Sequence, residues 1–236
     1  MPIAYLVTGA NRGIGRGLVE IYLSQPHGIV VAAVRDPAHP TSQSLKNLPK
    51  EQTTTLIIVQ IRSESATDAV EAVKELKTSH GVNVLDVVVA NAGYGNTDAL
   101  VPIASARPAD MIEHYQINAI GPVVLFGAVL PLLQKSQSPK FVTISSAAGS
   151  IEGLSNTPFP MTAYGSSKAA LNWLTVKIHH EHPNIIAFPM HPGFIQTDMG
   201  NAGAAAWGVD KAPFTLDRNV PGIAEVVGHP GTELLR

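Results

Sequence analysis

The chain has 236 residues, 45% of them apolar and 14% charged, and carries a net charge of −2. So small a charge attracts neither nucleic acid nor an anionic membrane, and we expect neither as a partner. The lack of cysteine excludes disulfides and thiolate metal sites. Because the N-terminus MPIAYLVTGANRG has no signal-peptide pattern, we predict a soluble, cytoplasmic enzyme with one domain over residues 1–236.

Short apolar runs rich in β-branched residues alternate with helical patterns along the whole chain. The runs predict strands at residues 3–7, 29–34, 56–61, 84–90, 140–145 and 185–190. They do not alternate with polar residues, which is typical of strands buried on both faces of a parallel sheet. Helices are predicted at residues 66–79, 109–133 and 163–181. This order predicts an α/β fold, a Rossmann-type doubly wound sheet with helices on both faces and ligands at the carboxyl ends of its strands.

A glycine-rich turn, TGANRGIG at residues 8–15, follows the first predicted strand and opens a predicted helix. Glycine lets the backbone turn tightly and approach a pyrophosphate, and the amides at a helix N-terminus donate to it. We therefore predict a dinucleotide cradle, although a purely structural turn is the alternative. Its contacts are expected from Gly9, Asn11, Arg12, Gly13, Ile14 and Gly15.

The end of the second predicted strand bears on the choice between NADPH and NADH. A carboxylate there usually binds the ribose 2′-hydroxyl of NAD, whereas an arginine favours the 2′-phosphate of NADP. This chain has Arg35 followed by Asp36, and Arg12 in the glycine turn is a second cation within reach. We expect NADPH/NADP+ rather than NADH; the alternatives are a solvated Arg35 and an Asp36 that caps the chain or binds ribose.

Polar residues also cluster where later predicted strands end, at Asn91-Ala92-Gly93, Ser145-Ser146 and His191-Pro192-Gly193. In addition, Tyr164 and Lys168 lie four residues apart in a predicted helix and therefore face the same way. A lysine charge beside a phenol favours the tyrosinate and lowers the phenol pKa.

Together with TGANRGIG and Asn118 in QINAIGP, these ordered motifs resemble the short-chain dehydrogenase/reductase family over nearly the whole chain. Within that family, passages such as LFGAVLPLLQKS and AYGSSKAALN are similar to fungal ketoreductases of the norsolorinic acid ketoreductase type. The resemblance implies an NADPH-dependent carbonyl reductase of apolar, aromatic or polyketide-type ketones, active in secondary metabolism. It also implies a homodimer or homotetramer that uses the long helices.

The resemblance implies a role for each matching residue. Tyr164 is the general acid, Lys168 binds the nicotinamide ribose and lowers the Tyr164 pKa, and Asn118 holds a relay water. The family motif SSxxG selects Ser146, rather than Ser145, to bind the substrate carbonyl. The remaining cofactor contacts are expected from Ile61, Asn91, Gly93, Pro192, Gly193, Ile195 and Thr197, besides Tyr164, Arg35 and the glycine turn. Asn118 could instead satisfy local backbone, and Ser146 could be a strand-end cap.

Residues 193–215 are expected to form a mobile lid rather than an ordinary loop. The chain departs from the family pattern at three places. Eighteen residues separate Ser146 from Tyr164, more than is usual, and we expect the extra segment to shape an apolar pocket. Arg62 replaces the usual aspartate near the adenine, and either the sheet lacks the last strand of the family or the sequence is cut short before it. Pocket residues are expected to be Tyr94, Leu100, Phe159, Met161, Phe194, Met199 and Trp207.

The sequence also bears on two other functions and on a metal site. A catalytically silent nucleotide-binding regulator on the same fold is the alternative, although such proteins typically lose the acid. A serine hydrolase is excluded because no serine is centred in G-x-S-x-G. No metal site is expected, because the adjacent histidines of HHEH at residues 179–182 point apart on a helix.

Overall fold

The computed structural model describes residues 2–156 and 159–228. Six parallel strands form one sheet in the order β3-β2-β1-β4-β5-β6. The strands are β1 Ile3–Thr8, β2 Gly28–Val34, β3 Thr55–Gln60, β4 Val87–Ala90, β5 Lys140–Ile144 and β6 Ile186–Met190. The order reverses between β1 and β4, and such a reversal places a ligand crevice at the carboxyl ends of these strands.

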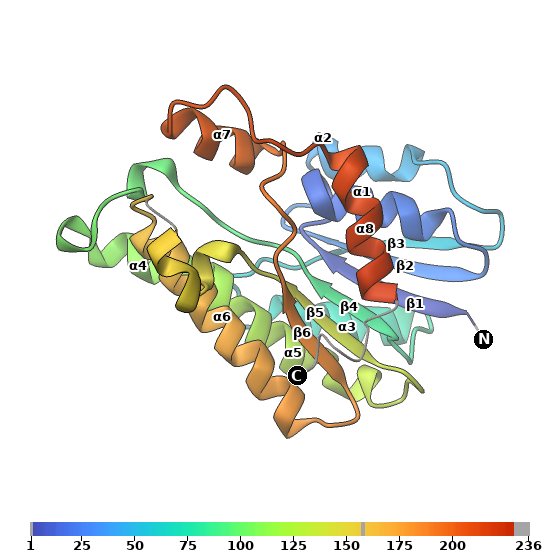
Figure 1. Ribbon diagram of the computed structural model, residues 1–236. Coiled ribbons are helices and arrows are strands. Elements are labelled where there is room, and N and C mark those ends of the chain that lie inside the picture. Colours follow the sequence, from blue (N-terminus) through green and yellow to red (C-terminus); the bar gives the residue numbers. More distant parts are fainter. Residues whose placement is uncertain (1, 157–158, 229–236) are drawn as a thin grey trace.

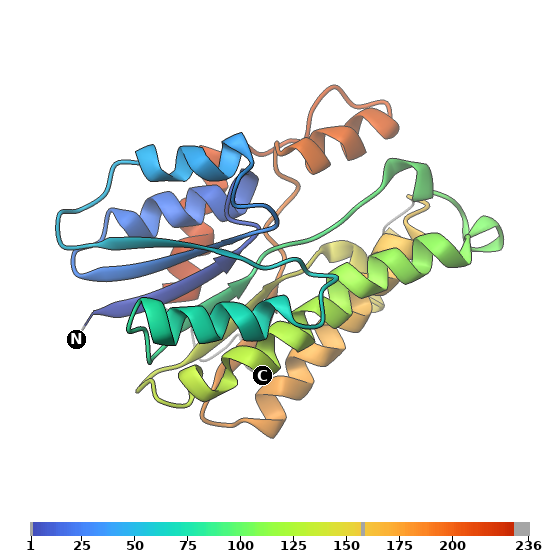
Figure 2. The same ribbon diagram turned by 180° about the vertical axis from the view of Figure 1, so that it is seen from behind.

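Helices cover both faces of the sheet (Figures 1 and 2). They are α1 Gly13–Leu23, α2 Pro40–Gln43, α3 Asp68–Ser79, α4 Pro108–Tyr115, α5 Gly121–Leu133, α6 Thr162–Glu181, α7 Asp198–Ala206 and α8 Leu216–Gly228. Helices α1 and α8 pack on one face, and α3, α5 and α6 pack on the other. The predicted Rossmann-type architecture is therefore confirmed.

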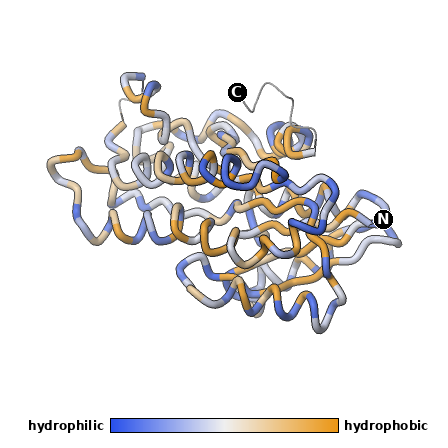
Figure 3. The backbone as a smooth tube through the Cα atoms, turned by 90° about the horizontal axis from the view of Figure 1, so that it is seen from below, coloured by the Kyte–Doolittle hydropathy of each residue, from blue (hydrophilic) through white to orange (hydrophobic). Residues whose placement is uncertain are grey.

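Each face of the sheet has its own apolar core. On one face Leu18 of α1 packs with Val30 of β2, and on the other Phe126 of α5 meets Phe141 of β5 edge to face at 5.0 Å. Figure 3 shows hydrophobic residues along the central strands and hydrophilic residues on many outer turns. Burial of such side chains on both faces explains why the strand sequences are continuously apolar.

The helical stretch from α4 to α5 contains a π-helical turn, η4, at Gln116–Ile120. Such turns insert one residue into a helix and frequently lie at functional sites; this one contains Asn118. By length and composition, residues Pro108–Leu133 could cross a membrane. However, half of the apolar 18-residue stretch within this range is buried inside the protein. Helix α5 packs against α3 and the sheet as a core helix does.

The predicted element boundaries were close but not exact. β4 begins at Val87 rather than at residue 84, and the single helix expected at 109–133 is interrupted by η4. Residues 193–215, expected as a loop, contain α7. The sheet of the described residues has six strands; the position expected for a further strand lies past Gly228, outside the described residues.

Candidate active site

Tyr164 and Lys168 lie one turn apart near the start of α6, beside the carboxyl end of β5. The Lys168 ammonium is 5.7 Å from the centre of the Tyr164 ring. It donates a 2.8 Å hydrogen bond to the carbonyl oxygen of Ile144, the last residue of β5. Only 4% of Lys168 is exposed. The pair is therefore fixed against the sheet rather than free on a helix surface.

Burial shifts the pKa values of this pair in opposite directions. It lowers the pKa of Lys168 to about 8, because the charged ammonium is poorly solvated there. It raises the pKa of Tyr164, and a hydrogen bond with the Ser146 hydroxyl offsets part of that rise. The predicted lowering of the Tyr164 pKa by Lys168 is thus wrong for this structure, since burial raises that pKa. Tyr164 is a neutral phenol at neutral pH.

The two neighbouring serines after β5 have different partners. The Ser145 hydroxyl donates to the side-chain oxygen of Asn172 on α6, which turns it away from Tyr164. The Ser146 hydroxyl hydrogen-bonds with Tyr164 and also accepts from the backbone amide of Ala148 at 3.2 Å. Ser146 therefore caps the short helix η5, Ala147–Gly149, and also reaches the phenol.

Asn118 in the π-helical turn is fully buried, and all its side-chain partners are protein groups. Its oxygen accepts from the backbone amide of Tyr94 at 2.7 Å, and its amide donates to the Tyr94 carbonyl at 2.8 Å. The same amide donates to Ser167 at 3.0 Å. A Cβ on Gly93 would lie 3.5 Å from the Asn118 oxygen and 3.6 Å from the Lys168 ammonium. The side chain satisfies local backbone, as the alternative interpretation expected, and Gly93 lies close to both Asn118 and Lys168.

The glycine turn has the close backbone approach that a pyrophosphate cradle needs. Gly9 and Gly13 have φ of 63° and 55°, values that favour glycine. A Cβ on Gly15 would lie 2.4 Å from the Gly9 carbonyl oxygen and 2.5 Å from the Asn91 amide nitrogen. Asn91 donates from this amide to the Thr8 carbonyl at 2.8 Å, which ties β4 to the turn. These residues fit a dinucleotide cradle, because Gly9 and Gly13 have positive φ and Gly15 has no room for a side chain.

The cations expected at the 2′-phosphate differ in their partners. The Arg12 guanidinium forms a 2.9 Å ion pair with Asp198, the first residue of α7, with side chains 66% and 78% exposed. The side chain of Arg35 is exposed and forms no ion pair within the described residues. Asp36 accepts from the Ala38 amide at 2.8 Å and so caps the chain. Arg35 therefore has no acidic partner among the described residues, whereas Arg12 links the cradle to α7 through Asp198.

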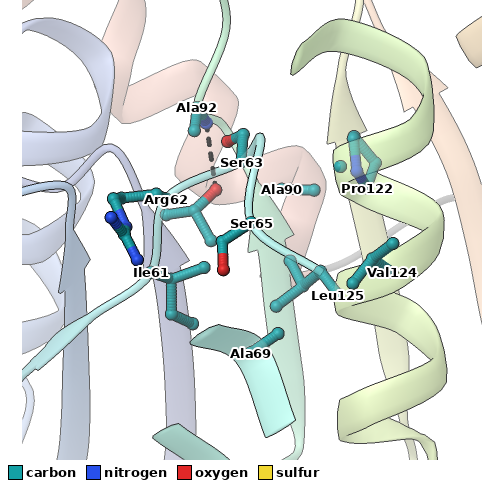
Figure 4. Close-up of a pocket in the computed structure, with 12 residues that line it drawn as sticks. Ile61, Arg62, Ser63, Ser65, Ala69, Ala90, Ala92, Pro122, Val124 and Leu125 are labelled. Atoms are coloured by element: carbon teal, nitrogen blue, oxygen red, sulfur yellow. Dashed lines mark hydrogen bonds between the residues drawn. The ribbon is translucent and has the colours of Figure 1, made fainter. Parts of the chain in front are cut away.

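Arg62, at the expected adenine position, is held by Asp68 on α3. Its guanidinium makes two hydrogen bonds of 2.8 and 2.9 Å with the Asp68 carboxylate. This pairing lowers the pKa of Asp68 well below its ordinary value. In Figure 4 the guanidinium points away from Ala90 and Pro122. Arg62 and Ile61 both line a small pocket between β3, β4 and α5. Its volume of about 10 Å³ suits roughly one water molecule.

The segment after β6 lies against the cradle and reaches Gly95, which neighbours Tyr164. A Cβ on Gly13 would lie 3.2 Å from a Thr197 methyl group, and Thr197 caps α7 through a 3.0 Å bond from the Gly200 amide. A Cβ on Gly95 would be 3.3 Å from the Met199 sulfur and 3.6 Å from the Tyr164 ring. Met199 of α7 and the Tyr164 ring thus both lie close to Gly95.

The other residues predicted after β6 are fixed by the chain that follows them. The Pro192 carbonyl accepts from Asn219 at 3.0 Å, Gly193 has φ of 94°, and Ile195 is buried.

Two residues near the site were missed by sequence reasoning. Ser167 donates to the Tyr164 carbonyl at 2.7 Å and accepts from Asn118, so it joins the π-helical turn to α6. Its signal was available, since a serine three residues after the candidate acid can bond back within the helix. Asp198, the partner of Arg12, had no signal, because 186 residues separate the two.

Within the described residues no cluster of three or more His, Asp or Glu is suited to a metal ion.

Three features together define the class of protein as a dinucleotide-dependent oxidoreductase. They are the parallel sheet of this order, the glycine cradle at its first turn and the Tyr–Lys pair beside its fifth strand.

Comparison with known proteins identifies the family. The family model for short chain dehydrogenases matches residues 4–206. Norsolorinic acid ketoreductase of Aspergillus parasiticus is 42% identical over 222 residues, which cover 93% of this chain and 80% of the relative. A short-chain dehydrogenase of Neurospora crassa is 40% identical over 226 residues, covering 94% and 87%. The chain therefore belongs to the short-chain dehydrogenase/reductase family.

Solved structures agree with this assignment. The NADPH-bound carbonyl reductase from chicken fatty liver has a TM-score of 0.82 and 31% identity, over 96% of this chain and 87% of that one. Carbonyl reductase Sniffer of D. melanogaster has a TM-score of 0.83 and 26% identity, over 99% and 94%. The protein is thus an oxidoreductase of CH–OH and C=O groups, a ketoreductase that uses a nicotinamide cofactor and a small carbonyl substrate.

Proposed function

We propose that the protein is an NADPH-dependent reductase of apolar aromatic ketones, with Tyr164 as general acid. The observation that carries this proposal is the convergence of Ser146, Tyr164 and Lys168. Ser146 follows β5, whereas Tyr164 and Lys168 belong to α6. The Ser146 hydroxyl hydrogen-bonds with the Tyr164 phenol, and Lys168 lies one helical turn after Tyr164. A donor to the carbonyl oxygen beside a proton donor is what reduction of a ketone requires.

In this mechanism each side chain acts on one oxygen atom. Ser146 donates to the substrate carbonyl oxygen and orients it toward Tyr164. Tyr164 gives its proton to that oxygen as negative charge develops there, and the raised phenol pKa keeps this proton in place until then. The nicotinamide cofactor, when bound, supplies the hydride.

Lys168 and Asn118 support the acid. Lys168 holds a proton at neutral pH, since its pKa is about 8, and its positive charge favours the tyrosinate that remains after proton transfer. Asn118 is a positioning residue, because its hydrogen bonds to the Tyr94 backbone and to Ser167 hold the chain after β4 against α6, the helix that carries Lys168. The backbone of the same π-helical turn would hold the relay water that returns the proton.

The choice of NADPH rests on Arg35 and Arg12. Arg35 follows β2 and is exposed, at the position where NADP-dependent Rossmann proteins place an arginine. Arg12 is paired with Asp198, but exposed ion pairs contribute only about 0–1 kcal/mol, so a phosphate can replace this partner. The carbonyl reductase from chicken fatty liver, a structural relative, was solved with NADPH.

An apolar, aromatic substrate is inferred from the segments that follow β4, β5 and β6. Large apolar side chains are exposed on them, at Ile103, Ile151, Leu154 and Val209. The relatives named norsolorinic acid ketoreductase act, by their name, on norsolorinic acid. We place the protein in secondary metabolism on this basis, as a cytoplasmic enzyme.

The outer faces of α4 to α6 are the proposed contact of a homodimer or homotetramer. Apolar side chains are exposed there at Ile112, Ile120, Val123, Trp173 and Val176. Patches of this kind on a soluble protein mark interaction sites. Light scattering of the purified protein measures the oligomeric state.

The test of function is cofactor oxidation with a panel of aromatic ketones, quinones and aliphatic diketones. We expect turnover with NADPH in preference to NADH, and loss of turnover in Tyr164→Phe. Cofactor binding without turnover of any carbonyl would instead favour a silent nucleotide-binding regulator.

A further inference from the structure

The hydrogen-bond ladder between β5 and β6 ends irregularly on the ligand side of the sheet. Its last regular bond runs from the Ser145 amide to the Met190 carbonyl oxygen at 2.7 Å. In a parallel ladder the next bond lies two residues further along each strand, which would join the Ala147 amide to the Pro192 carbonyl. That carbonyl instead accepts from Asn219 of α8 at 3.0 Å. The Ala147 amide therefore needs a different acceptor.

The side chain of His191 supplies this acceptor. The Ala147 amide donates to Nδ1 of His191 at 3.2 Å. A neutral imidazole has one nitrogen that accepts and one that carries a proton, so this bond fixes the tautomer with the proton on Nε2. Although the residue is exposed, partial desolvation lowers the pKa of His191, which keeps the ring neutral and able to accept at neutral pH. The imidazole thus continues the ladder where the backbone of β6 leaves it.

This hydrogen bond acts on the peptide unit that follows Ser146. A peptide unit is planar, so the Ala147 N–H and the Ser146 carbonyl move together. The carbonyl accepts from the Gly149 amide at 3.0 Å, and the N–H is held by His191. Because the residues before Ser146 are held in the sheet, its Cα–Cβ bond then has one direction. That direction presents the hydroxyl to Tyr164.

The opposite side of the same turn is fixed to α6. A Cβ on Gly149 would lie 2.6 Å from the Lys168 carbonyl carbon, and the Gly149 carbonyl accepts from Asn172 at 3.2 Å. Helix α6 also carries Tyr164, so this contact sets the turn relative to the acid. His191 holds the turn from the β6 side.

We propose that His191 is a positioning residue that holds the Ser146 hydroxyl in line with Tyr164 for carbonyl reduction. It acts through the Ala147 amide and does not touch the reacting atoms. This inference rests on the proposed function, because it requires Ser146 to bind the substrate carbonyl. The contact is exposed, so its loss should leave the fold intact and loosen the turn that carries the hydroxyl.

Two substitutions separate the hydrogen bond of His191 from its bulk. His191→Asn places an amide oxygen where Nδ1 lies relative to Cβ and so keeps an acceptor. His191→Leu is of similar size and has no acceptor. His80→Leu is the matched control, because His80 is exposed at the end of α3. Each variant is assayed with NADPH and an aromatic ketone, and His191→Leu is also combined with Ser146→Ala.

We expect His191→Leu to lower kcat about tenfold, a smaller loss than removal of the Ser146 hydroxyl causes. The KM for NADPH and the urea midpoint should not change, and His80→Leu should match the unmodified protein. His191→Asn should restore kcat close to the unmodified value. In the Ser146→Ala background, His191→Leu should cause no further loss, because the group that it positions is gone. An equal loss in both backgrounds, or failure of asparagine to restore kcat, would overturn the positioning role.

Proton–nitrogen correlation NMR of the imidazole tests the hydrogen bond apart from activity. The His191 signals, assigned by their disappearance in His191→Asn, should show the proton on Nε2. A proton on Nδ1 would overturn the inference whatever the kinetics.

The two proposals fail in different ways. If Ser146→Ala loses activity and His191→Leu does not, the role of Ser146 stands and that of His191 is contradicted. If Ser146→Ala keeps full activity while the Nε2 proton is observed, the hydrogen bond is supported, but the proposed role of Ser146 fails and the positioning role fails with it.

Discussion

Replacing Lys168 with methionine is expected to stabilise the protein at neutral pH and to abolish its activity. Lys168 is buried, and its pKa falls from 10.5 to about 8 on folding. A shift of that size corresponds to about 3 kcal/mol of destabilisation when the side chain is charged in both states. Methionine removes the charge and occupies a similar volume. It also leaves the Ile144 carbonyl without its donor, which costs about 1 kcal/mol, so the net gain is roughly 2 kcal/mol.

The pH dependence follows from the direction of the shift. Below pH 8 the lysine is charged in the folded and unfolded states, and the whole penalty is present. Between about 8 and 10.5 the folded protein loses this proton before the unfolded chain does, so stability recovers as the pH rises. The advantage of Lys168→Met should therefore shrink across this window.

Urea unfolding at about pH 7 and about pH 10 measures these free energies. Lys177→Met is the matched control, because Lys177 is exposed on the same helix and pairs with Glu181; it should change stability by less than about 0.5 kcal/mol. The reasoning is refuted if Lys168→Met is less stable than the unmodified protein at pH 7, or if their difference is the same at both pH values.

Three further substitutions test the site. Ser146→Ala should lower kcat about 100-fold or more, whereas Ser145→Ala should spare kcat and cost about 1 kcal/mol of stability in urea; similar kcat losses would contradict the assignment of Ser146. Arg35→Ala should raise the KM for NADPH about tenfold without changing that for NADH, and a parallel rise in both would exclude a phosphate contact. Gly149→Ala places a Cβ 2.6 Å from the Lys168 carbonyl carbon, so α6 must shift and kcat should fall, while Gly127→Ala, which meets nothing within 4 Å, should stabilise by about 1 kcal/mol.

The strands and the glycine cradle could be predicted because their causes are local. Burial on both faces demands continuous apolar runs, and a tight βα turn demands glycine, so both are visible in a few consecutive residues. The family motif predicts Ser146 rather than Ser145 as the serine of the site, and the hydrogen bond from Ser145 to Asn172 favours that choice. The π-helical turn at Gln116–Ile120 could not be predicted, because one inserted residue changes the helix register without changing its apolar character.

Contacts between distant segments could not be predicted either. Arg12 pairs with Asp198, and Arg62 is held by Asp68. The partner of an exposed cation depends on how α3 and α7 pack, which no short motif records. The Tyr164 pKa was mispredicted for a related reason, since the spacing from Lys168 reveals a nearby charge but not the extent of burial.

The central claim is that the Tyr164 hydroxyl supplies the proton, and single-turnover reduction by Tyr164→Phe tests it most directly. NADPH affinity, measured first by fluorescence, should be largely retained, because phenylalanine preserves the ring beside Gly95. Hydride transfer to an aromatic ketone should then fall by about 1,000-fold, within the range for loss of a general acid. A variant that binds NADPH normally and reduces the ketone at the unmodified rate would contradict the account.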